Sequence, residues 1–438
     1  MHKIPSLVLA LLFPLIIFSQ TPSELTVTEK KLLAYIDQHL PETLRLLSES
    51  VNINSGTFNK PGVKKVGDLF AQELQKAGFT TEWVSLPDSL NRAGHLVATR
   101  KGKKGKRVFI IGHLDTVFEP DMPFSPFTLL NDSTATGQGV NDMKGGDVVA
   151  IVALQALQFY GLLDDADITV YFTGDEEKAG HPTNVSRADF INRAQTAEVA
   201  LGFESAVGLH TIATARRGSS SWILRVKAKT GHSSGIFSSG SGYGAIYESA
   251  RILNSFRESL SNEKYLTFNP GLILGGSDIQ FNDTLSGGKA IGKTNIISPE
   301  VVVTGDLRFL TEAQKSAARE KMRRIVSRNL NGTEAHIDFQ DGIPSMEPTN
   351  GNQQLLALVN QVSQDMGIGI TRAGDPGSRG AGDISYVARY LDGIDGLGAS
   401  GRGAHAPGET INLHEFPLLI KRAALLLYRL TNPNTPKK

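Results

Sequence analysis

The sequence contains no cysteine, and its charges nearly cancel. With no thiol among 438 residues, disulfide scaffolds, thiolate zinc fingers, iron–sulfur clusters and cysteine nucleophiles are excluded, so any metal site must use His, Asp and Glu. The 45 basic and 44 acidic residues leave a net charge of +1, which exerts no long-range pull on nucleic acid or an anionic membrane. We therefore expect a small-molecule substrate and no nucleic-acid partner.

Long apolar runs are also scarce, and the clearest one lies at the N-terminus. It follows Lys3 and extends from Leu7 to Phe18, broken only by Pro14. At about 1.5 Å per residue such a run is too short for a hydrocarbon core of roughly 30 Å, so a transmembrane anchor is the weaker interpretation. We expect a cleaved signal peptide over residues 1–20, export to the periplasm or the medium, and no stable membrane anchor.

The rest of the chain has a globular composition and enough length for two or three domains. Short apolar runs at 108–111, 168–172 and 199–203 predict buried strands, and a helical pattern over 146–160 lies between the first two. Alternation of strands and helices predicts an α/β domain with a mostly parallel sheet. Helical spacing also marks residues 28–51, 63–77 and 416–430.

From residue 220 the pattern changes to strand, helix, strand, strand, helix, strand, which is the ferredoxin-like β-α-β-β-α-β unit. The expected elements are residues 222–228, 244–260, 266–274, 301–309, 312–330 and 335–339. We therefore expect a small domain, residues 217–340, inserted into a larger one made of residues 21–216 and 341–438.

Polar side chains follow each of the three buried strands of the larger domain. The first strand is followed by His113 and Asp115, the second by the triplet 175–177, and the third by Glu204. Since the carboxyl ends of parallel strands meet at one edge of a sheet, these side chains should converge. His113 and Asp115 leave the same face of an extended chain, so Asp115 can fix the histidine tautomer that binds metal, although a local hydrogen bond at a strand end is the alternative.

Further candidate ligands lie in two glycine-rich segments. Asp142 is either the cap of the following helix or a ligand, and His405 lies in a loop where a histidine is not often a ligand. The acidic triplet 175–177 repels itself unless a cation or solvent compensates it, which allows either a metal site or a solvated loop. Together these imidazoles and carboxylates suit two zinc-like ions bridged by one carboxylate, with cobalt or manganese as alternatives.

Seven motifs resemble, in order along nearly the whole chain after the leader, those of the co-catalytic di-zinc metallopeptidases of the glutamate carboxypeptidase, dimeric aminoacylase and succinyl-diaminopimelate desuccinylase type. They are GHLDTVF, GVNDMKGGD, TGDEEKAG, LGFES, TGHSS, TNIISP with GDLRF, and GAHAPGE. The resemblance implies that the inserted domain is a lid and dimerisation domain, and that the protein forms a homodimer.

The resemblance also implies a ligand set for two zinc ions. Asp142 would bridge them, His113 and Glu204 would complete one site, and Glu177 and His405 the other. Relatives often have a cis peptide directly after the bridging aspartate, so we expect one after Asp142.

Catalytic roles are implied in the same way. Glu176 resembles the general base that deprotonates a water between the two ions, and the resulting hydroxide attacks the amide. Asp115 resembles the carboxylate that supports His113. His232 matches a residue that stabilises the oxyanion in the neighbouring subunit's site, and a histidine capped by Ser233 is the alternative interpretation.

Asn295 and Arg308 match positions that grip the free α-carboxylate of a substrate, although Arg308 could also form an ordinary salt bridge on a strand. We therefore expect a zinc-dependent exopeptidase or amidohydrolase that acts on small peptides or N-acyl amino acids, most like glutamate carboxypeptidase. A dipeptidase or aminoacylase of the same family is the nearest alternative, and a catalytically silent binding protein is the alternative from another class.

Overall fold

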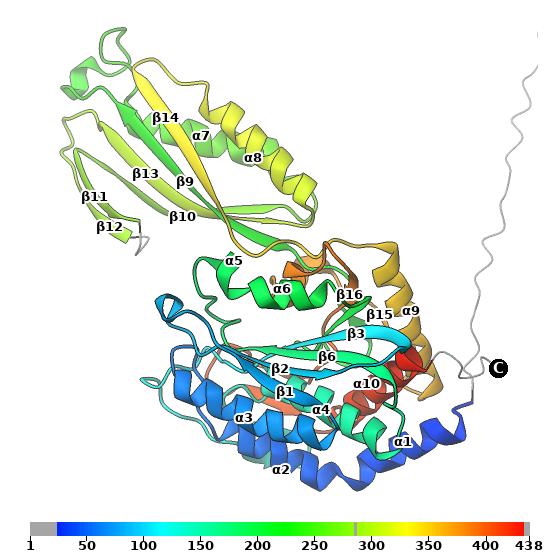
Figure 1. Cartoon of the computed structure of the whole chain (residues 1–438). Helices are drawn as coiled ribbons and strands as arrows, with labels where there is room; N and C mark the ends of the chain where they lie inside the picture. The colour runs from blue at the N-terminus through cyan, green and yellow to red at the C-terminus, as the bar shows by residue number, and fades with distance from the viewer. Residues whose placement is uncertain (1–23, 284–286, 433–438) are drawn as a thin grey trace, which may run out of the picture.

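The computed structural model describes residues 24–283 and 287–432, which form a large α/β domain and a smaller domain that extends away from it (Figure 1). The signal peptide expected at residues 1–20 lies outside the described residues. Within the described ranges, no helix has both the length and the apolar character needed to cross a membrane.

The large domain is built on a six-stranded mixed sheet with strand order β1-β2-β6-β3-β7-β16. The strands are β1 (Thr80–Val84), β2 (His95–Arg100), β6 (Ala166–Thr173), β3 (Lys104–His113), β7 (Val199–Gly202) and β16 (Asp392–Ile394). From β6 to β16 the neighbours are parallel, whereas β1 and β2 add an antiparallel edge next to β6. The predicted α/β class is confirmed, with a parallel half that carries the three strands expected from the sequence.

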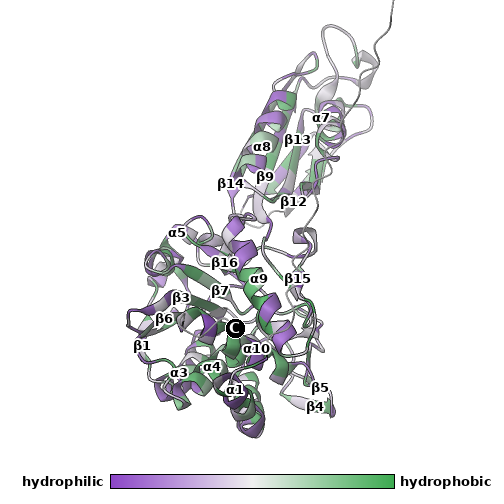
Figure 2. Ribbon diagram, turned by 90° about the vertical axis from the view of Figure 1, so that its right-hand side faces the viewer, coloured by the Kyte–Doolittle hydropathy of each residue, from purple (hydrophilic) through white to green (hydrophobic). Residues whose placement is uncertain are grey.

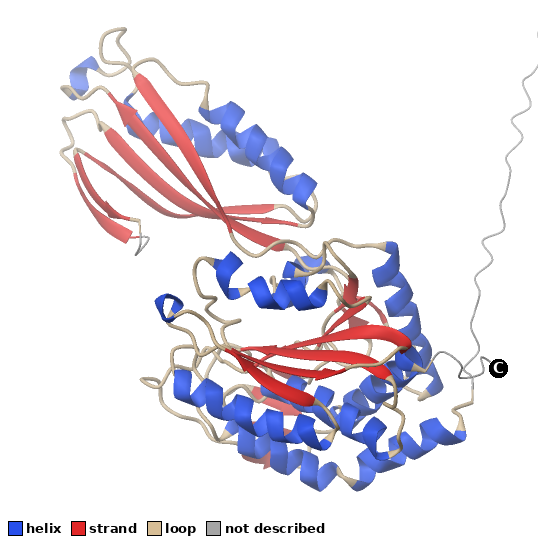
Figure 3. Ribbon diagram, in the orientation of Figure 1, coloured by secondary structure: helices blue, strands red, loops and turns tan. Residues whose placement is uncertain are grey.

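Helices cover both faces of this sheet (Figure 3). The larger hydrophobic core lies under α1 (Val27–Gln38), α2 (Leu40–Val51), α3 (Lys60–Lys76), α4 (Lys144–Phe159), α9 (Asn350–Asp365) and α10 (Phe416–Thr431). A smaller core lies on the other face under α6 (Ala188–Ala194) and the 3-10 turn Asp383–Tyr386, beside the short α5 (Thr183–Ser186). Figure 2 shows the hydrophobic colour in the central strands and on the helices beside them, such as α4 and α9.

The helical pattern over residues 28–51 corresponds to two helices, α1 and α2, which meet at His39. Pro41 lies in the first turn of α2 and has no N–H with which to continue the hydrogen bonding of α1. His39 therefore leaves the helical conformation with φ −103° and ψ 17°, and the chain turns there.

The smaller domain has the six predicted elements in the predicted order. They are β9 (Gly218–Ala228), α7 (Gly244–Leu260), β10 (Thr267–Gly276), β13 (Glu300–Phe309), α8 (Glu312–Val326) and β14 (Thr333–Asp341). The sheet is antiparallel with order β10-β13-β9-β14, and α7 and α8 pack on one face over a separate core (Figure 1). A hairpin of β11 (Asp278–Asn282) and β12 (Gly287–Ile291), which was not predicted, follows β10.

Short strands and turns complete the large domain. The strands β4 (Thr128–Asn131), β5 (Thr134–Thr136), β17 (Gly401–Arg402) and β18 (Thr410–Asn412) form one small sheet, and β8 (Thr211–Ile212) pairs with β15 (Arg372–Ala373). The 3-10 turns are η1 (Asp88–Leu90), η2 (Ser233–Gly235), η3 (Pro376–Ser378) and η4 (Asp383–Tyr386); η2 lies in the smaller domain. The loop between β5 and α4 and the loop between β17 and β18 carry the two candidate ligands outside the main sheet.

The start of α4 packs directly against the end of β7. A Cβ atom added at Gly146 would lie 2.0 Å from the carbonyl oxygen of Phe203, the residue before Glu204. Only glycine therefore allows the helix to approach the strand this closely. This contact sets the separation between the loop of Asp142 and the strand end of Glu204.

Gly146→Ala should lower the urea midpoint of unfolding, because a backbone oxygen cannot yield to the added methyl group. We expect a loss of about 1–3 kcal/mol in the free energy of unfolding. Gly240→Ala is the control, since a Cβ there meets nothing within 4 Å, and its midpoint should correspond to a change of less than about 0.5 kcal/mol. Equal midpoints for the two variants would contradict the close-packing argument.

Candidate metal centre

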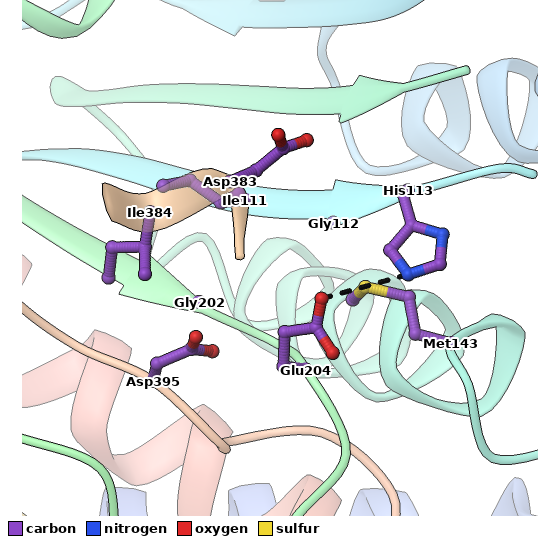
Figure 4. Close-up of a pocket in the computed structure, with 9 residues that line it drawn as sticks. All are labelled: Ile111, Gly112, His113, Met143, Gly202, Glu204, Asp383, Ile384 and Asp395. Carbon is purple, nitrogen blue, oxygen red and sulfur yellow. Dashed lines mark ion pairs between the residues drawn. The ribbon is translucent and has the colours of Figure 1, made fainter. Parts of the chain in front are cut away.

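The ends of β3, β6 and β7 bring the predicted ligands to one edge of the main sheet. His113 is the last residue of β3, Glu176 and Glu177 follow β6, and Glu204 follows β7. Figure 4 shows the His113 imidazole and the Glu204 carboxylate directed at each other across this edge, with His113 Nε2 3.7 Å from Glu204 Oε1. Parallel strand direction alone therefore explains the convergence of four side chains from distant parts of the sequence.

Asp142 lies between two imidazoles. Its Oδ1 is 3.4 Å from Nε2 of His113, and its Oδ2 is 3.1 Å from Nε2 of His405. Glu204 lies beside the first histidine, and Glu177 Oε2 is 3.2 Å from His405 Nε2. The structure thus groups the five residues into two sets that share Asp142.

The donor set fits divalent metal ions. The ligand atoms of His113, Glu176 and Glu204 lie within 4.8 Å of one another, and so do those of His113, Asp142 and Glu177. Within the described part of the chain, Glu177 Oε1 is buried and has no hydrogen-bond partner. Because a buried carboxylate oxygen needs a donor or a cation, this atom supports a metal ligand at Glu177. Nitrogen and oxygen ligands of this kind suit zinc.

Crowding perturbs the carboxylates of the centre. Burial, reinforced by the charge of Glu204, raises the pKa of Glu176 well above its ordinary value. Burial and the charge of Asp142 raise the pKa of Glu204 to about 7, and burial also raises the pKa of Glu177. Several buried acids at one place resist simultaneous ionisation unless positive charge is added. Bound cations would supply that charge.

The pKa values of the two histidines are raised as well. Burial opposes protonation of His113, but contacts with Asp115 and Asp142 raise its pKa well above the usual value. Contacts with Asp142 and Glu177 raise the pKa of His405 to about 11. Since a histidine must lose its proton to bind a metal, protons and metal ions compete for these two rings.

Asp115 ties the ends of β3 and β6 together. Its carboxylate accepts hydrogen bonds from the hydroxyl of Thr57 at 2.6 Å and from the backbone N–H groups of Glu176 and Glu177 at 3.0 and 3.2 Å. The Nδ1 atom of His113 is 2.9 Å from the main-chain oxygen of Asp115 and 3.5 Å from its Oδ1. Asp115 thus contacts His113 as the sequence suggested, and it also positions both glutamates.

The acidic triplet does not act as a unit, which corrects the expectation that all three carboxylates need a metal or solvent. Asp175 points away from Glu176 and Glu177 and forms a buried ion pair with Arg187. Its carboxylate also accepts hydrogen bonds from the hydroxyl of Ser186 at 2.6 Å and from the N–H of Gly180 at 2.8 Å. Only the second and third members of the triplet therefore face the metal centre.

Glu409 is a functional residue that the sequence reasoning missed. Its carboxylate accepts hydrogen bonds from the backbone N–H groups of Gly139 at 2.8 Å, Asn141 at 2.8 Å and Asp142 at 2.6 Å. The peptide bond between Asp142 and Met143 is cis, as expected from the resemblance. Glu409 is the last residue of the GAHAPGE motif, so its proximity to a candidate ligand was the available signal.

His405 lies on the exposed loop between β17 and β18. Its side chain is 58% exposed, whereas that of Asp142 is 11% exposed. The backbone of His405 has φ 65°, a left-handed conformation that non-glycine residues seldom adopt. Such conformations persist where surrounding structure fixes them, often at functional sites. The structure thus holds this ring over the centre from the solvent side.

His232 and Asn295 lie together at the outer end of the smaller domain. His232 and Ile296 form an isolated bridge, and the main-chain oxygen of Asn295 accepts a hydrogen bond from Ser233 at 2.9 Å. Nδ1 of His232 accepts a hydrogen bond from the N–H of Ser234 at 3.2 Å, so the histidine does cap a turn, through Ser234 rather than Ser233.

Arg308 lies at the opposite end of the same sheet. It is paired with Ser219 and Thr267, next to the connection with the large domain, whereas Glu300 marks the end of β13 near Asn295. Eight extended residues separate Glu300 from Arg308, or about 26 Å at roughly 3.3 Å per residue. Within one chain, Asn295 and Arg308 therefore lie too far apart to hold the same carboxylate. Arg308 Nε donates to Asp306 at 3.0 Å in a half-exposed local ion pair.

The strand ends of the α/β sheet present one imidazole and several buried acids, and two loops add the shared carboxylate and the second imidazole, a donor set that fits a metal-dependent hydrolase. The model of Peptidase family M20/M25/M40 matches residues 109–429, and the chain belongs to this family. It is therefore a hydrolase of the metallopeptidase class.

Individual relatives agree with this assignment. The chain is 26% identical to carboxypeptidase G2 of Pseudomonas sp. (strain RS-16) over 398 residues, which cover 88% of this chain and 89% of that protein. It is 23% identical to succinyl-diaminopimelate desuccinylase of Bordetella petrii, over 79% of this chain and 87% of that one. Aminopeptidase PepT of Bacillus cereus has the same fold, with a TM-score of 0.71 at 16% identity, over 89% of this chain and 98% of that one.

Asp175→Asn should destabilise the protein by about 3 kcal/mol at neutral pH, because Arg187 then loses a buried partner. Burial opposes ionisation of Asp175, but Arg187 lowers its pKa from 3.8 to about 2. The ionised carboxylate therefore contributes its stability above about pH 4 and loses it as the pH falls toward 2. Chemical denaturation should therefore show that the difference in the free energy of unfolding between wild type and Asp175→Asn narrows as the pH falls from about 4 toward 2.

Glu49→Gln is the control for this comparison, because Glu49 forms an exposed pair with Arg45. It should change the free energy of unfolding by less than about 0.5 kcal/mol. A difference between wild type and Asp175→Asn that stays constant between pH 5 and 2 would contradict the assigned ion pair.

Proposed function

We propose that the protein is a di-zinc exopeptidase or amidohydrolase that cleaves an amide bond next to a free α-carboxylate, in the manner of a glutamate carboxypeptidase. The observation that carries the proposal is the position of Asp142 between His113 and His405, with Glu176 grouped beside His113 and Glu204. The relation to carboxypeptidase G2 supports the same type of reaction.

The ions would be held by the two sets of residues that share Asp142. His113 and Glu204 would hold one zinc ion, Glu177 and His405 the other, and Asp142 both. The YXEP protein of Bacillus subtilis, a dinuclear metal binding peptidase of the same family, has the same fold with a TM-score of 0.61. When bound, paired ions activate a water molecule and polarise the scissile carbonyl.

Glu176 is the residue that moves the proton. Its carboxylate accepts a proton from the attacking water, whose oxygen adds to the carbonyl carbon, and returns that proton to the departing nitrogen as the C–N bond breaks. The oxygen of the water thereby ends in the new carboxylate, and the proton carried by Glu176 ends on the released amine. The backbone N–H of Glu176 donates a hydrogen bond to the Asp115 carboxylate, and this contact fixes the position of Glu176 in the site.

Arg308 is the proposed anchor for the α-carboxylate of the substrate. It lies next to the connection between the two domains, and its half-exposed guanidinium is paired only with the exposed Asp306 among the described residues. A planar guanidinium can exchange that partner for a substrate carboxylate and bind it through two parallel hydrogen bonds.

The proposed location of this activity is outside the cytoplasmic membrane, in the periplasm or the medium. The apolar run from Leu7 to Phe18 is too short to span a membrane and is typical of a cleaved leader. Mass spectrometry of the protein from its native host should find an N-terminus near residue 21.

Glu176→Gln should lower kcat for an N-acyl glutamate by about 10²–10⁴-fold, because the variant keeps the shape of the side chain but cannot accept the proton. Its zinc content should remain at about two equivalents per chain. Glu320→Gln, on the exposed face of α8, should keep full activity. Full activity of metal-loaded Glu176→Gln would refute the proposed base, and activity that survives complete removal of metal by a chelator would refute the metal mechanism.

A panel of substrates separates the proposed activity from its nearest alternatives. Preferred hydrolysis of dipeptides with a free amine would indicate a dipeptidase, and hydrolysis of N-acetyl amino acids regardless of side chain would indicate an aminoacylase. Binding of zinc with no turnover of any amide would indicate a silent relative.

A homodimer is part of the proposal because His232 lies far from its own chain's connection to the large domain. The loop after His232 and the start of α7 expose Phe237, Ile246 and Tyr247, each more than half exposed. Phe237 and Tyr247 are in contact, with ring centroids 5.2 Å apart. Contiguous exposed apolar side chains of this kind mark contact surfaces. A partner seated there would bring His232 close to a second active site.

Mixing Glu176→Gln and His232→Ala subunits should restore activity if His232 serves the neighbouring site. After subunit exchange, half of the dimers contain one intact site each, so about a quarter of wild-type activity is expected. Mixing Glu176→Gln with Glu177→Gln is the control, since both changes affect a chain's own site and no intact site forms. No recovery above that control would contradict the shared site.

A further inference from the structure

The two proposed ion sites are built from different kinds of structure. His113 and Glu204, the ligands of the first site, lie at or just after the ends of β3 and β7. These strands are parallel neighbours in which Ile111 pairs with Gly202, and the N–H of Phe203 donates to the carbonyl oxygen of Ile111 at 2.9 Å. Hydrogen bonds of the main sheet therefore set the distance between the two ligands of the first site.

The second site depends on two loops. Asp142 lies between β5 and α4, and His405 lies between β17 and β18, where residues 401–408 are all exposed. Nε2 of His405 is 3.1 Å from the carboxylate of Asp142 and 3.2 Å from that of Glu177, but all three residues are ligands of the same proposed ion. A contact outside the ligand set must therefore fix the distance between the two loops.

Glu409 provides that contact. This buried residue ends the loop that carries His405, and its carboxylate accepts the three hydrogen bonds already described from backbone N–H groups of residues 139–142. Its main-chain oxygen accepts two more, from the hydroxyl of Thr136 at 2.6 Å and from the N–H of Gly137 at 3.3 Å. One residue of the His405 loop thus holds the whole segment that leads to Asp142.

The contact needs a carboxylate and not merely a side chain of the same size. Oε1 of Glu409 accepts from the N–H groups of Asn141 and Asp142, and Oε2 accepts from that of Gly139. An ionised carboxylate has acceptor positions for all three donors, whereas an amide has an NH₂ group in place of one oxygen. Glu409→Gln would therefore place two donors against each other while filling the same space.

We propose that Glu409 is the positioning residue of the second ion site, which sets the affinity for the ion at Glu177 and His405 by joining the His405 loop to the Asp142 loop. This inference rests on the proposed function, because it assumes two ions that share Asp142. If the loops separate, the first ion keeps two ligands held by the sheet. The second ion keeps only Glu177, whose N–H is bonded to Asp115. The second ion should therefore be lost selectively.

The test is a zinc titration of the metal-free full chain, followed by calorimetry. Wild type should bind two ions. Glu409→Gln should bind the first ion within about tenfold of the wild-type affinity and the second about 100-fold more weakly, since partners that orient metal ligands have effects of this size. His405→Ala, which removes a ligand of the second site, should produce the same pattern.

Glu415→Gln is the matched control. Glu415 lies in the same region, but its carboxylate accepts a hydrogen bond from the hydroxyl of Ser400 at 2.6 Å and not from the Asp142 loop. This variant should bind both ions as wild type does.

Hydrogen exchange measures the positioning without metal or substrate. In the metal-free protein, the amides of residues 139–142 should exchange at least tenfold faster in Glu409→Gln than in wild type, because their acceptor is altered. The amides of α10 should exchange at the wild-type rate, which shows that the variant is folded. Unchanged protection of residues 139–142 would overturn the inference.

Activity gives a further readout that a damaged fold would not produce. Hydrolysis of an N-acyl glutamate by Glu409→Gln should be low at a zinc concentration that saturates wild type, and it should return as free zinc is raised. Glu176→Gln should not respond to added zinc, because its defect is in proton transfer.

The outcomes separate this inference from the proposed function. If Glu409→Gln binds both ions as tightly as wild type, or loses affinity equally for both, the inference fails while the di-zinc function stands. If wild type binds two ions but hydrolyses no amide, the proposed function fails and the titration still decides the role of Glu409. A wild-type chain that binds fewer than two ions would refute both.

Discussion

The carboxylate of Asp142, held between two imidazoles, is the constraint on which the rest of the centre depends. Its two oxygens can face two cations only if the loop before α4 is fixed, and Glu409 fixes it through three backbone hydrogen bonds. Gly146 allows the same loop to sit tightly against β7. The loop before α4 is thereby made rigid by contacts at both ends, which a bridging ligand requires.

The second requirement is that the buried carboxylates near Asp142 have different roles. Asp175 is neutralised by Arg187, whereas Glu177 keeps an oxygen without a partner among the described atoms. Asp115 uses its carboxylate to accept hydrogen bonds from the backbone N–H groups of Glu176 and Glu177. Neighbouring acids thus receive different roles through different partners, since environment and not residue type sets the state of a carboxylate.

Much of this arrangement follows from the sequence, because the carboxyl ends of parallel strands meet at one edge of a sheet and His113 and Glu204 lie at two such ends. The split of residues 28–51 into two helices was not predicted, although Pro41 was the available signal. The partners of Asp175 and the role of Glu409 were not predicted either, because each depends on contacts between distant segments. The separation of Asn295 from Arg308 likewise required the register of β13, which local patterns do not specify.

The near-zero net charge of the chain hides a strong local asymmetry. Acids crowd the strand ends of the large domain, while Arg308 lies next to the connection with the smaller domain. A substrate with a carboxylate at one end and the scissile amide at the other fits this arrangement in one orientation only, because reversal would place its negative charge against the acids. With no global attraction available, orientation therefore depends on these few placed groups.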